Sequence, residues 1–232
     1  MIAIIVAMDK ELNLLLPLLD SAREFNQDGY NFFLGNIQDT QLVIMKSGIG
    51  KVNAALATQV LIKNFAPKLV INSGVAGGVG GDAGIMDIVV ADRITYSDVW
   101  CGPGTNFGQA ADCPLYFDMF ELPVTTTHAK VKKGLICSSD RFIASDDEVA
   151  AIRSRFPQVM AVDMESGAIA QTCFLASTPC AVIRVVSDTP GEADNISQYE
   201  DFWVKAPEAT FQFLKEVLAH IDTTQFTDKG DE

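Results

Sequence analysis

Three carboxylates follow apolar runs that predict buried strands: Glu11, Glu165 and Asp188. In open α/β sheets, ligands bind beyond the carboxyl ends of the strands, so side chains that follow different strands can meet at one edge. Each carboxylate alone has an ordinary explanation, because acidic residues are common in the first turn of a helix and in turns. Together, at successive strand ends, they favour an acid/base site.

The rest of the composition narrows the chemistry to these acids. The two histidines, His128 and His220, are far apart in the sequence, so neither a Ser-His-Asp nor a Cys-His set is predicted. The five cysteines are scattered without C-x-x-C spacing, which predicts neither a zinc site nor a disulfide framework. We therefore expect metal-free and cofactor-free chemistry, such as hydrolysis of a small neutral or cationic substrate by two acids in different protonation states.

Alternating strand and helix patterns predict an α/β fold in a single domain, with a central mixed β-sheet flanked by helices on both faces. We expect this domain to span 1–222, followed by a frayed tail over 223–232. The predicted strands cover 2–7, 30–35, 41–46, 69–73, 86–92, 132–138, 159–164 and 180–187. The predicted helices cover 9–19, 51–64, 146–155, 165–176 and 199–220.

Glycine-rich segments are interpreted as turns. After the strand at 69–73, the segment Gly74–Gly78 includes Ala76 and Gly77, and we expect its exposed backbone N–H groups to meet a ligand closely. GVGGDA at 78–83 matches a dinucleotide fingerprint, but a strand and not a helix is predicted after it, so no such site is expected. The long segment 97–118 is rich in Gly and Pro and is interpreted as a functional loop.

Charge and hydropathy exclude several classes of partner. The net charge of −13 argues against nucleic acid and against anionic membrane surfaces, because both attract Lys and Arg. No window reaches the ~18 apolar residues of a membrane span, and the apolar N-terminus is too short for a signal peptide. A cytoplasmic protein is expected.

Six motifs occur in a fixed order along most of the chain: AMDKE at 7–11, KSGIGKVNAA at 46–55, NSGVAGG at 72–78, SSDRFI at 138–143, VDMES at 162–166 and RVVSD at 184–188. As an ordered set they resemble the 5′-methylthioadenosine/S-adenosylhomocysteine nucleosidases of the nucleoside phosphorylase-type family. The resemblance implies a nucleoside phosphorylase-like fold and release of adenine from an adenine nucleoside by hydrolysis. It also implies a homodimer.

The resemblance also implies roles for the polar residues. Glu11 matches the carboxylate that activates the attacking water, and Asp188 matches the acid that protonates adenine N7, with Ser187 orienting it. Glu165 matches the carboxylate that holds the ribose hydroxyls, beside Met164 under the sugar. Because a protonated base leaves as a neutral group, Asp188 must hold a proton near neutral pH, which requires a raised pKa. Glu11 must be ionised to act as a base.

Apolar residues complete the implied pocket. Phe142 matches the aromatic side chain that stacks on the base, and the backbone of Ile143 would bond the edge of the base. Met8 and Ile49 match the lining around the 5′-alkylthio group. Tyr199 corresponds to an aromatic residue that is given to the pocket of the neighbouring subunit.

Asp163 is interpreted differently from its neighbour Glu165. If the strand continues to this residue, its side chain points to the other face, so we expect a structural role and pairing with backbone or a base. Asp163 also stands where many family members carry glutamate, as Val75 stands where many carry serine, and 96–101 lacks the usual histidine. These departures bear on the 5′ group that is preferred.

Three alternatives remain beside hydrolysis of methylthioadenosine or adenosylhomocysteine. The first is cleavage of aminofutalosine. The second is a purine nucleoside phosphorylase, which needs converging cations for phosphate, and the motifs offer mainly Arg184. The third is a non-catalytic protein that only binds nucleosides.

Overall fold

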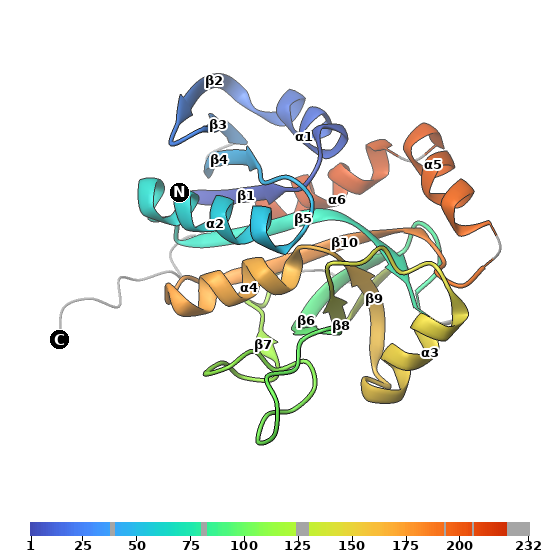
Figure 1. Cartoon of the computed structure of the whole chain (residues 1–232). Coiled ribbons are helices and arrows are strands. Elements are labelled where there is room, and N and C mark those ends of the chain that lie inside the picture. Colours follow the sequence, from blue (N-terminus) through green and yellow to red (C-terminus); the bar gives the residue numbers. More distant parts are fainter. Residues whose placement is uncertain (38–39, 80–82, 124–129, 193, 206, 222–232) are drawn as a thin grey trace.

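A single mixed sheet organises the chain. The computed structural model describes residues 1–37, 40–79, 83–123, 130–192, 194–205 and 207–221. Within them, ten strands form one sheet in the order β10-β6-β8-β9-β5-β1-β4-β3-β2, and β7 pairs with β6. Helices lie on both faces of the sheet (Figure 1), which confirms the predicted α/β fold with a central mixed sheet.

The strands are β1 (Ile2–Val6), β2 (Asp20–Gln27), β3 (Tyr30–Ile37), β4 (Thr40–Lys46), β5 (Leu69–Gly78), β6 (Ile88–Tyr96), β7 (Phe117–Asp118), β8 (Val131–Ser138), β9 (Val159–Asp163) and β10 (Cys180–Asp188). The helices are α1 (Asp9–Leu15), η1 (Leu16–Leu18, a 3₁₀ turn), α2 (Lys51–Phe65), α3 (Asp146–Arg155), α4 (Ser166–Leu175), α5 (Asn195–Lys205) and α6 (Pro207–His220).

The long strand β5 brings the ends of the other strands together. Along most of its length β5 is parallel to β1 and β10, and its last residues pair antiparallel with β9. Because β10 also pairs with β6, the strands β5, β10, β6, β8 and β9 close into a ring. In this register Asp188 lies opposite Gly77, and Gly77 lies opposite Val162, so the ends of β10, β5 and β9 meet at one place.

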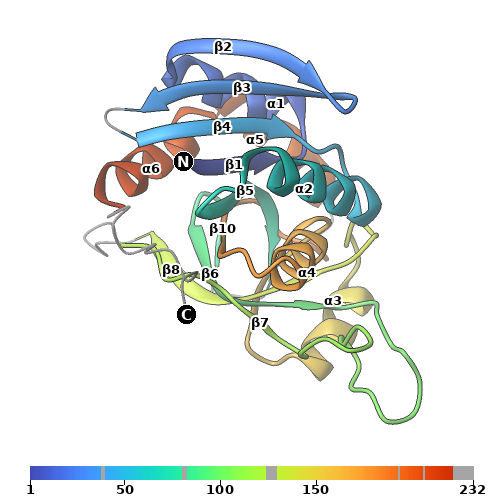
Figure 2. The ribbon, with the colours of Figure 1, turned by 90° about the vertical axis from the view of Figure 1, so that its left-hand side faces the viewer.

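Two apolar layers hold the sheet between the helices. On one face α2 and α4 lie side by side over the sheet (Figure 2), and they bury Leu61 and Ile169. On the other face α1 and α6 bury Leu15 and Leu218. Each such side chain contributes about 1.5–3 kcal/mol when it leaves water, so both layers fix the strand ends from which the pocket is built.

The segment Gly74–Gly78 is not a turn, and the prediction of a glycine-rich turn there is wrong. These residues are the last half of β5 and remain paired with β10 and β9. Close approach explains the glycines. A Cβ atom at Gly74 would lie 2.6 Å from Glu11 Oε1, and one at Gly77 would lie 2.5 Å from Pro190 Cγ.

Proline residues and one polar strand account for the other differences. The helix expected over 9–19 ends at Leu15, since Pro17 lies in the following 3₁₀ turn and has no N–H to donate. The helix expected over 199–220 is two helices, and Pro207 opens the second. Strand β2 was not predicted, because it is an exposed, polar edge strand without an apolar alternation.

Strand β7 was not predicted either, because Phe117–Asp118 is only two residues long and ends the segment 97–118 that was interpreted as a loop. The remaining elements have the predicted type, with ends that differ by a few residues; β6, for example, covers Ile88–Tyr96 and not 86–92. Among the described helices, none is long and apolar enough to cross a membrane. The expected tail at 223–232 and residues 80–82 of the GVGGDA segment lie outside the described residues.

We predict that Gly78→Ala destabilises the fold. The new methyl group would collide with the backbone oxygen of Ala83 and would lie 2.7 Å from Cγ1 of Val186, a fully buried side chain of β10, so the backbone or the core would have to shift. We expect a loss of about 1–3 kcal/mol in the free energy of unfolding, measured by urea denaturation. Gly84→Ala is the control, since the nearest atom to its Cβ is 3.9 Å away, and equal stability of the two variants would contradict the assignment.

Candidate active site

The twelve residues predicted to form a site line one pocket at the carboxyl ends of β5, β9 and β10. They are Met8, Glu11, Ile49, Ala76, Gly77, Phe142, Ile143, Met164, Glu165, Ser187, Asp188 and Tyr199. Five further residues share the lining: Val75, Arg141, Val162, Asp163 and Pro190. The predicted roles of the individual residues stay predictions, but the fold does bring the residues together.

Glu11 is held in place by the start of its own helix. Residue Met8 is the N-cap of α1 and Glu11 is the third helical residue, so the Glu11 carboxylate can reach back to the backbone. Its Oε2 accepts the N–H groups of Ala7 at 2.8 Å and Met8 at 2.9 Å, and its Oε1 accepts that of Val75 at 3.2 Å. Glu11 is thus a buried carboxylate with fixed orientation.

The pKa of Glu11 reflects opposing influences. Burial raises it, while the positive charge of Arg184 and the three N–H groups lower it. The direction that prevails is upward. A carboxylate with a raised pKa is a stronger base than an exposed one, and it acts as a base wherever the pH leaves it ionised.

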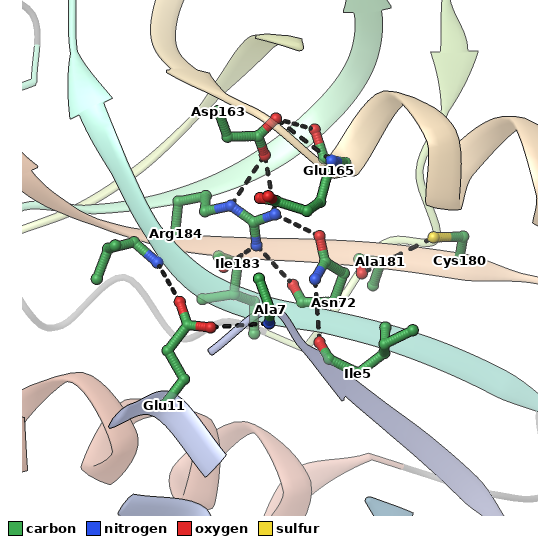
Figure 3. A network of polar contacts seen from close by, with 12 residues as sticks. Ile5, Ala7, Glu11, Asn72, Asp163, Glu165, Cys180, Ala181, Ile183 and Arg184 are labelled. Atoms are coloured by element: carbon green, nitrogen blue, oxygen red, sulfur yellow. Dashed lines mark hydrogen bonds and ion pairs between the residues drawn. The ribbon is translucent and has the colours of Figure 1, made fainter. Parts of the chain in front are cut away.

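Arg184 is not among the residues that line the pocket, and its guanidinium is bound by Asp163 and Asn72 (Figure 3). Its Nε and Nη2 atoms contact Asp163 Oδ2 at 2.9 and 2.8 Å, and both side chains are almost completely buried. The guanidinium also donates to the side-chain oxygen and the backbone oxygen of Asn72. The Asn72 amide in turn donates to the Ile5 carbonyl at 3.0 Å. This network confirms the expectation that Asp163 pairs with a base, and it ties β1, β5, β9 and β10 together.

Asp163 has a second structural contact. Its Oδ1 accepts the hydroxyl of Ser166 at 2.9 Å and the backbone N–H of Ser166 at 3.3 Å, at the first residue of α4. A carboxylate at a helix N-terminus satisfies an otherwise free N–H and interacts favourably with the helix dipole. Asp163 therefore fixes both Arg184 and the start of the helix that follows Glu165.

Glu165 lies in the pocket with a nearly neutral pKa. Gly50 donates its backbone N–H to Glu165 Oε1 at 2.9 Å, from the loop that precedes α2. Burial and then the charge of Asp163 raise the pKa of Glu165 to about 7, against the lowering effects of Gly50 and Arg184. Glu165 therefore changes its charge in the physiological range, and its ionised form can accept two hydrogen bonds from a ligand.

Asp188 has one oxygen in use and one available. The Ser187 hydroxyl donates to Asp188 Oδ1 at 2.7 Å. The other oxygen, Oδ2, is buried and has no hydrogen-bond partner within the described part of the chain. Burial raises the pKa of Asp188, although Ser187 and the neighbouring Asn195 amide oppose the shift. An oriented acid with a raised pKa and a free oxygen is suited to donate a proton to a ligand.

The apolar wall closes the other side of the pocket. The rings of Phe142 and Tyr199 meet edge to face at 5.9 Å, and the Tyr199 hydroxyl lies 3.3 Å from Met8 Sδ. Ile49 and Phe142 are each about half exposed and mark the open side. Tyr199 lines the pocket of its own chain, which differs from its expected place in the pocket of a neighbouring subunit.

The sequence does contain a signal for the buried network around Arg184. Arg184 and Asn72 lie in otherwise apolar runs, and a polar residue in such a strand needs a buried partner. Val75, Val162 and Pro190 carried no comparable signal. Among the described residues, no group of three or more His, Cys, Asp or Glu side chains is placed to hold a metal ion.

The mixed-sheet α/β fold with a carboxylate-lined pocket at its strand ends is the architecture that the resemblance to nucleoside phosphorylase-like proteins implies. Comparison with family models agrees. Residues 1–219 match the model described as the phosphorylase superfamily. The chain belongs to this superfamily.

The similar proteins include nucleosidases from several bacteria. A 5′-methylthioadenosine/S-adenosylhomocysteine nucleosidase of Lysinibacillus sphaericus is 37% identical over 227 residues, which cover 94% of this chain and 99% of the relative. The solved structure of such a nucleosidase from S. pneumoniae, with the transition-state inhibitor MT-ImmA, is 34% identical with a TM-score of 0.89, covering 95% of this chain and 99% of the other. The enzyme of Colwellia psychrerythraea in complex with adenine is 34% identical with a TM-score of 0.86, and 94% of each chain is covered.

We predict that Asp163→Ala costs about 3–5 kcal/mol in the free energy of unfolding, because it leaves the buried Arg184 charge without its counterion. Urea denaturation measures this loss. Asp9→Ala is the matched control: the Asp9–Lys46 pair has a similar distance, 2.7 Å against 2.8 Å, but is solvent-exposed, and its loss should cost about 0–1 kcal/mol. Equal losses in the two variants would contradict the central place of Asp163.

Proposed function

We propose that this chain hydrolyses the N-glycosidic bond of 5′-methylthioadenosine and/or S-adenosylhomocysteine, releasing adenine and the 5-thio-substituted ribose. The observation that carries the proposal is the pairing of Glu11 and Asp188 in one pocket. Glu11 is a buried base held by three N–H groups, and Asp188 is a buried acid with a raised pKa and an unbonded oxygen. The similarity to nucleosidases over nearly the whole chain supports the same activity.

In this mechanism Asp188 acts on the leaving base and Glu11 acts on the attacking water. Asp188 donates its proton to N7 of adenine, so that the base departs neutral and the carboxylate left behind is stabilised by Ser187. Glu11 removes a proton from the water that attacks the anomeric carbon. The raised pKa values suit both roles, because they make ionised Glu11 a stronger base and keep the proton on Asp188 to a higher pH than on an exposed carboxyl group.

Glu165 acts on the sugar. Its ionised carboxylate accepts hydrogen bonds from the two ribose hydroxyls, and its negative charge stabilises the oxocarbenium-like sugar that forms as the bond breaks. Phe142 stacks on the base, Ile143 bonds its edge through the backbone, and Met164 packs under the ribose. Met8, Ile49 and Tyr199 form the apolar surroundings of the 5′-alkylthio group.

The arrangement of cations argues against a phosphorylase. Arg184 is occupied by Asp163 and Asn72. Of the pocket residues in the described part of the chain, Arg141 is the one cation, and it is paired with Glu148 at 2.6 Å. A phosphate ion would also be placed close to Glu11. Water therefore fits the pocket better as the nucleophile.

We predict that the purified chain releases adenine from methylthioadenosine in phosphate-free buffer. Glu11→Gln and Asp188→Asn should each lower kcat/KM by about 10²–10⁴-fold, since each removes one proton transfer. Adenine is measured by chromatography. Glu121→Gln is a matched control, because it removes a surface carboxylate paired with Lys133 and should leave the rate unchanged.

The same assay separates the alternatives. Turnover that requires phosphate would indicate a phosphorylase, and a rate that neither substitution changes would indicate a protein that only binds nucleosides. Aminofutalosine, adenosylhomocysteine and inosine are compared with methylthioadenosine. Exclusive turnover of aminofutalosine would replace the proposed substrates and leave the proposed bond cleavage in place.

A homodimer is also proposed. Four large apolar side chains on α2 and α4 are half or more exposed: Val52, Leu56, Phe174 and Leu175. These two helices pack side by side, and the outer side that carries these exposed residues is here named the α2–α4 surface. An exposed apolar patch of this kind typically marks a protein interface, and the family resemblance implies a second copy as the partner.

We predict that the wild-type chain is a dimer in light-scattering measurements and that Val52→Glu combined with Leu56→Glu yields monomers. In a twofold interface each carboxylate is introduced twice, so the repulsion is doubled. Ile85→Glu, at an exposed apolar residue outside these helices, should remain dimeric. A monomeric wild-type chain would contradict the assignment.

A further inference from the structure

One ion pair and two hydrogen bonds join the start of α2 to the loops that follow β6 and β8. Lys51 Nζ lies 2.7 Å from Asp98 Oδ1. The other oxygen of Asp98 accepts the backbone N–H of Asp140 at 3.0 Å. Asp140 Oδ1 then accepts the backbone N–H of Lys51 at 2.8 Å. These three residues, Lys51, Asp98 and Asp140, are named the α2 brace.

The α2 brace is more enclosed than an ordinary surface ion pair. The side chains of Lys51 and Asp98 are 18% and 27% exposed, against 39% and 72% for Lys46 and Asp9. The Lys51 ammonium also lies over the ring of Tyr96, 4.9 Å from its centre. Reduced solvent screening and the cation–π contact make this pair stronger than the exposed pairs of the chain.

The loop before α2 depends on these external contacts. Gly48 and Gly50 both have φ near +90°, a conformation that glycine adopts without strain but does not prefer over others, so local preference does not fix the segment around Ile49. Gly50 is the N-cap of α2 and provides no side chain to cap the helix. Asp140 supplies the missing carboxylate from a distant loop by accepting the Lys51 N–H. The position of Gly50 is therefore set by residues outside its own segment.

The α2 brace reaches the pocket at two points. Gly50, next to Lys51, donates its N–H to Glu165 Oε1 at 2.9 Å. Asp140 directly precedes Arg141 and Phe142, which line the pocket. A shift of the brace would therefore move both the hydrogen-bond donor of Glu165 and the aromatic wall.

We propose that Lys51, Asp98 and Asp140 are positioning residues that hold the Gly50 amide on Glu165 and so fix this carboxylate for the ribose hydroxyls. This inference rests on the proposed nucleosidase function, since it assigns the positioning of the sugar-binding group of that site. None of the three residues lines the pocket itself.

The proposal has an electrostatic consequence that can be measured. Glu165 faces four charged or titratable groups from the surrounding elements: Glu11, Asp163, Arg184 and Tyr199. Its pKa is about 7, and the Gly50 N–H is one of the two influences that lower it. Loss of this hydrogen bond moves the pKa upward. At pH 7 a smaller fraction of Glu165 is then ionised, and the ribose is held less well, whereas at pH 9 the carboxylate is ionised again.

The test is Asp98→Asn, which keeps the side-chain shape and removes the nearer of the two carboxylate charges beside the Lys51 ammonium; the other is Asp140 Oδ2 at 3.9 Å. We expect the KM for methylthioadenosine at pH 7 to rise by about 5–10-fold, the order of effect of one lost hydrogen bond, with kcat changed less than about twofold. The ratio of wild-type to variant kcat/KM should fall toward one as the pH rises to 9. Using the ratio cancels the loss of the Asp188 proton, which affects both proteins equally.

Two variants of Lys51 and one surface control test whether the effect comes from the Lys51–Asp98 ion pair. Lys51→Met should reproduce the effect of Asp98→Asn, and Lys51→Arg, which keeps the charge, should largely restore the wild-type KM. Glu121→Gln removes a carboxylate from a surface pair of the same length, 2.7 Å, and should change nothing. Urea denaturation of each variant monitors stability separately.

Two results for Asp98→Asn would contradict the proposal. An unchanged KM in Asp98→Asn, or a loss of kcat/KM that is the same at every pH, would overturn the positioning role. If the wild-type chain releases no adenine, the proposed function fails, and the same pH-dependent ratio is then read from the Kd of methylthioadenosine by calorimetry. The two proposals can thus fail independently.

Discussion

The buried ion pair of Arg184 and Asp163 is the interaction on which the site depends. A guanidinium in the middle of a closed sheet is stable only with a counterion and a full set of acceptors, and Asp163, Asn72 and a backbone carbonyl of its own strand provide them. Because these partners come from β5 and β9, satisfying one charge also fixes the strand ends that carry Glu165 and Asp188. The same pair places a positive charge behind Glu11 and a negative charge beside Glu165.

This charge arrangement differentiates three buried carboxylates that would otherwise behave alike. Burial raises the pKa of each. Arg184 and three backbone N–H groups counteract that shift for Glu11, whereas Asp163 reinforces it for Glu165. Asp188 lies beyond the direct contacts of Arg184 and has mainly neutral donors around it. The three carboxylates thus have different surroundings in one pocket, and such differences are how a site combines a base with an acid, as cleavage of a bond to a poor leaving group requires.

Sequence patterns predicted the central sheet and the meeting of Glu11, Glu165 and Asp188, because apolar runs identify buried strands and carboxylates after them gather at one edge. Most of the other pocket residues were implied by the family resemblance and not by these patterns. They failed at Gly74–Gly78, since a glycine required by close packing looks the same in sequence as a glycine required by a turn. Strand β2 gave no signal because it is polar and exposed. The α2 brace had none either: Lys51, Asp98 and Asp140 lie in three separate segments, and only the folded chain shows that they meet. The pKa shifts likewise depend on burial, which a linear pattern does not contain.

The pH dependence of kcat/KM for the hydrolysis of methylthioadenosine tests the central claim most directly. If Glu11 and Glu165 act ionised while Asp188 acts protonated, the profile is bell-shaped. The rate rises as the two glutamates lose their protons, and it falls at higher pH as Asp188 loses its own. A rate that remains level after the rise, with no fall at high pH, would contradict the requirement for a protonated Asp188 and with it the division of roles among the three carboxylates.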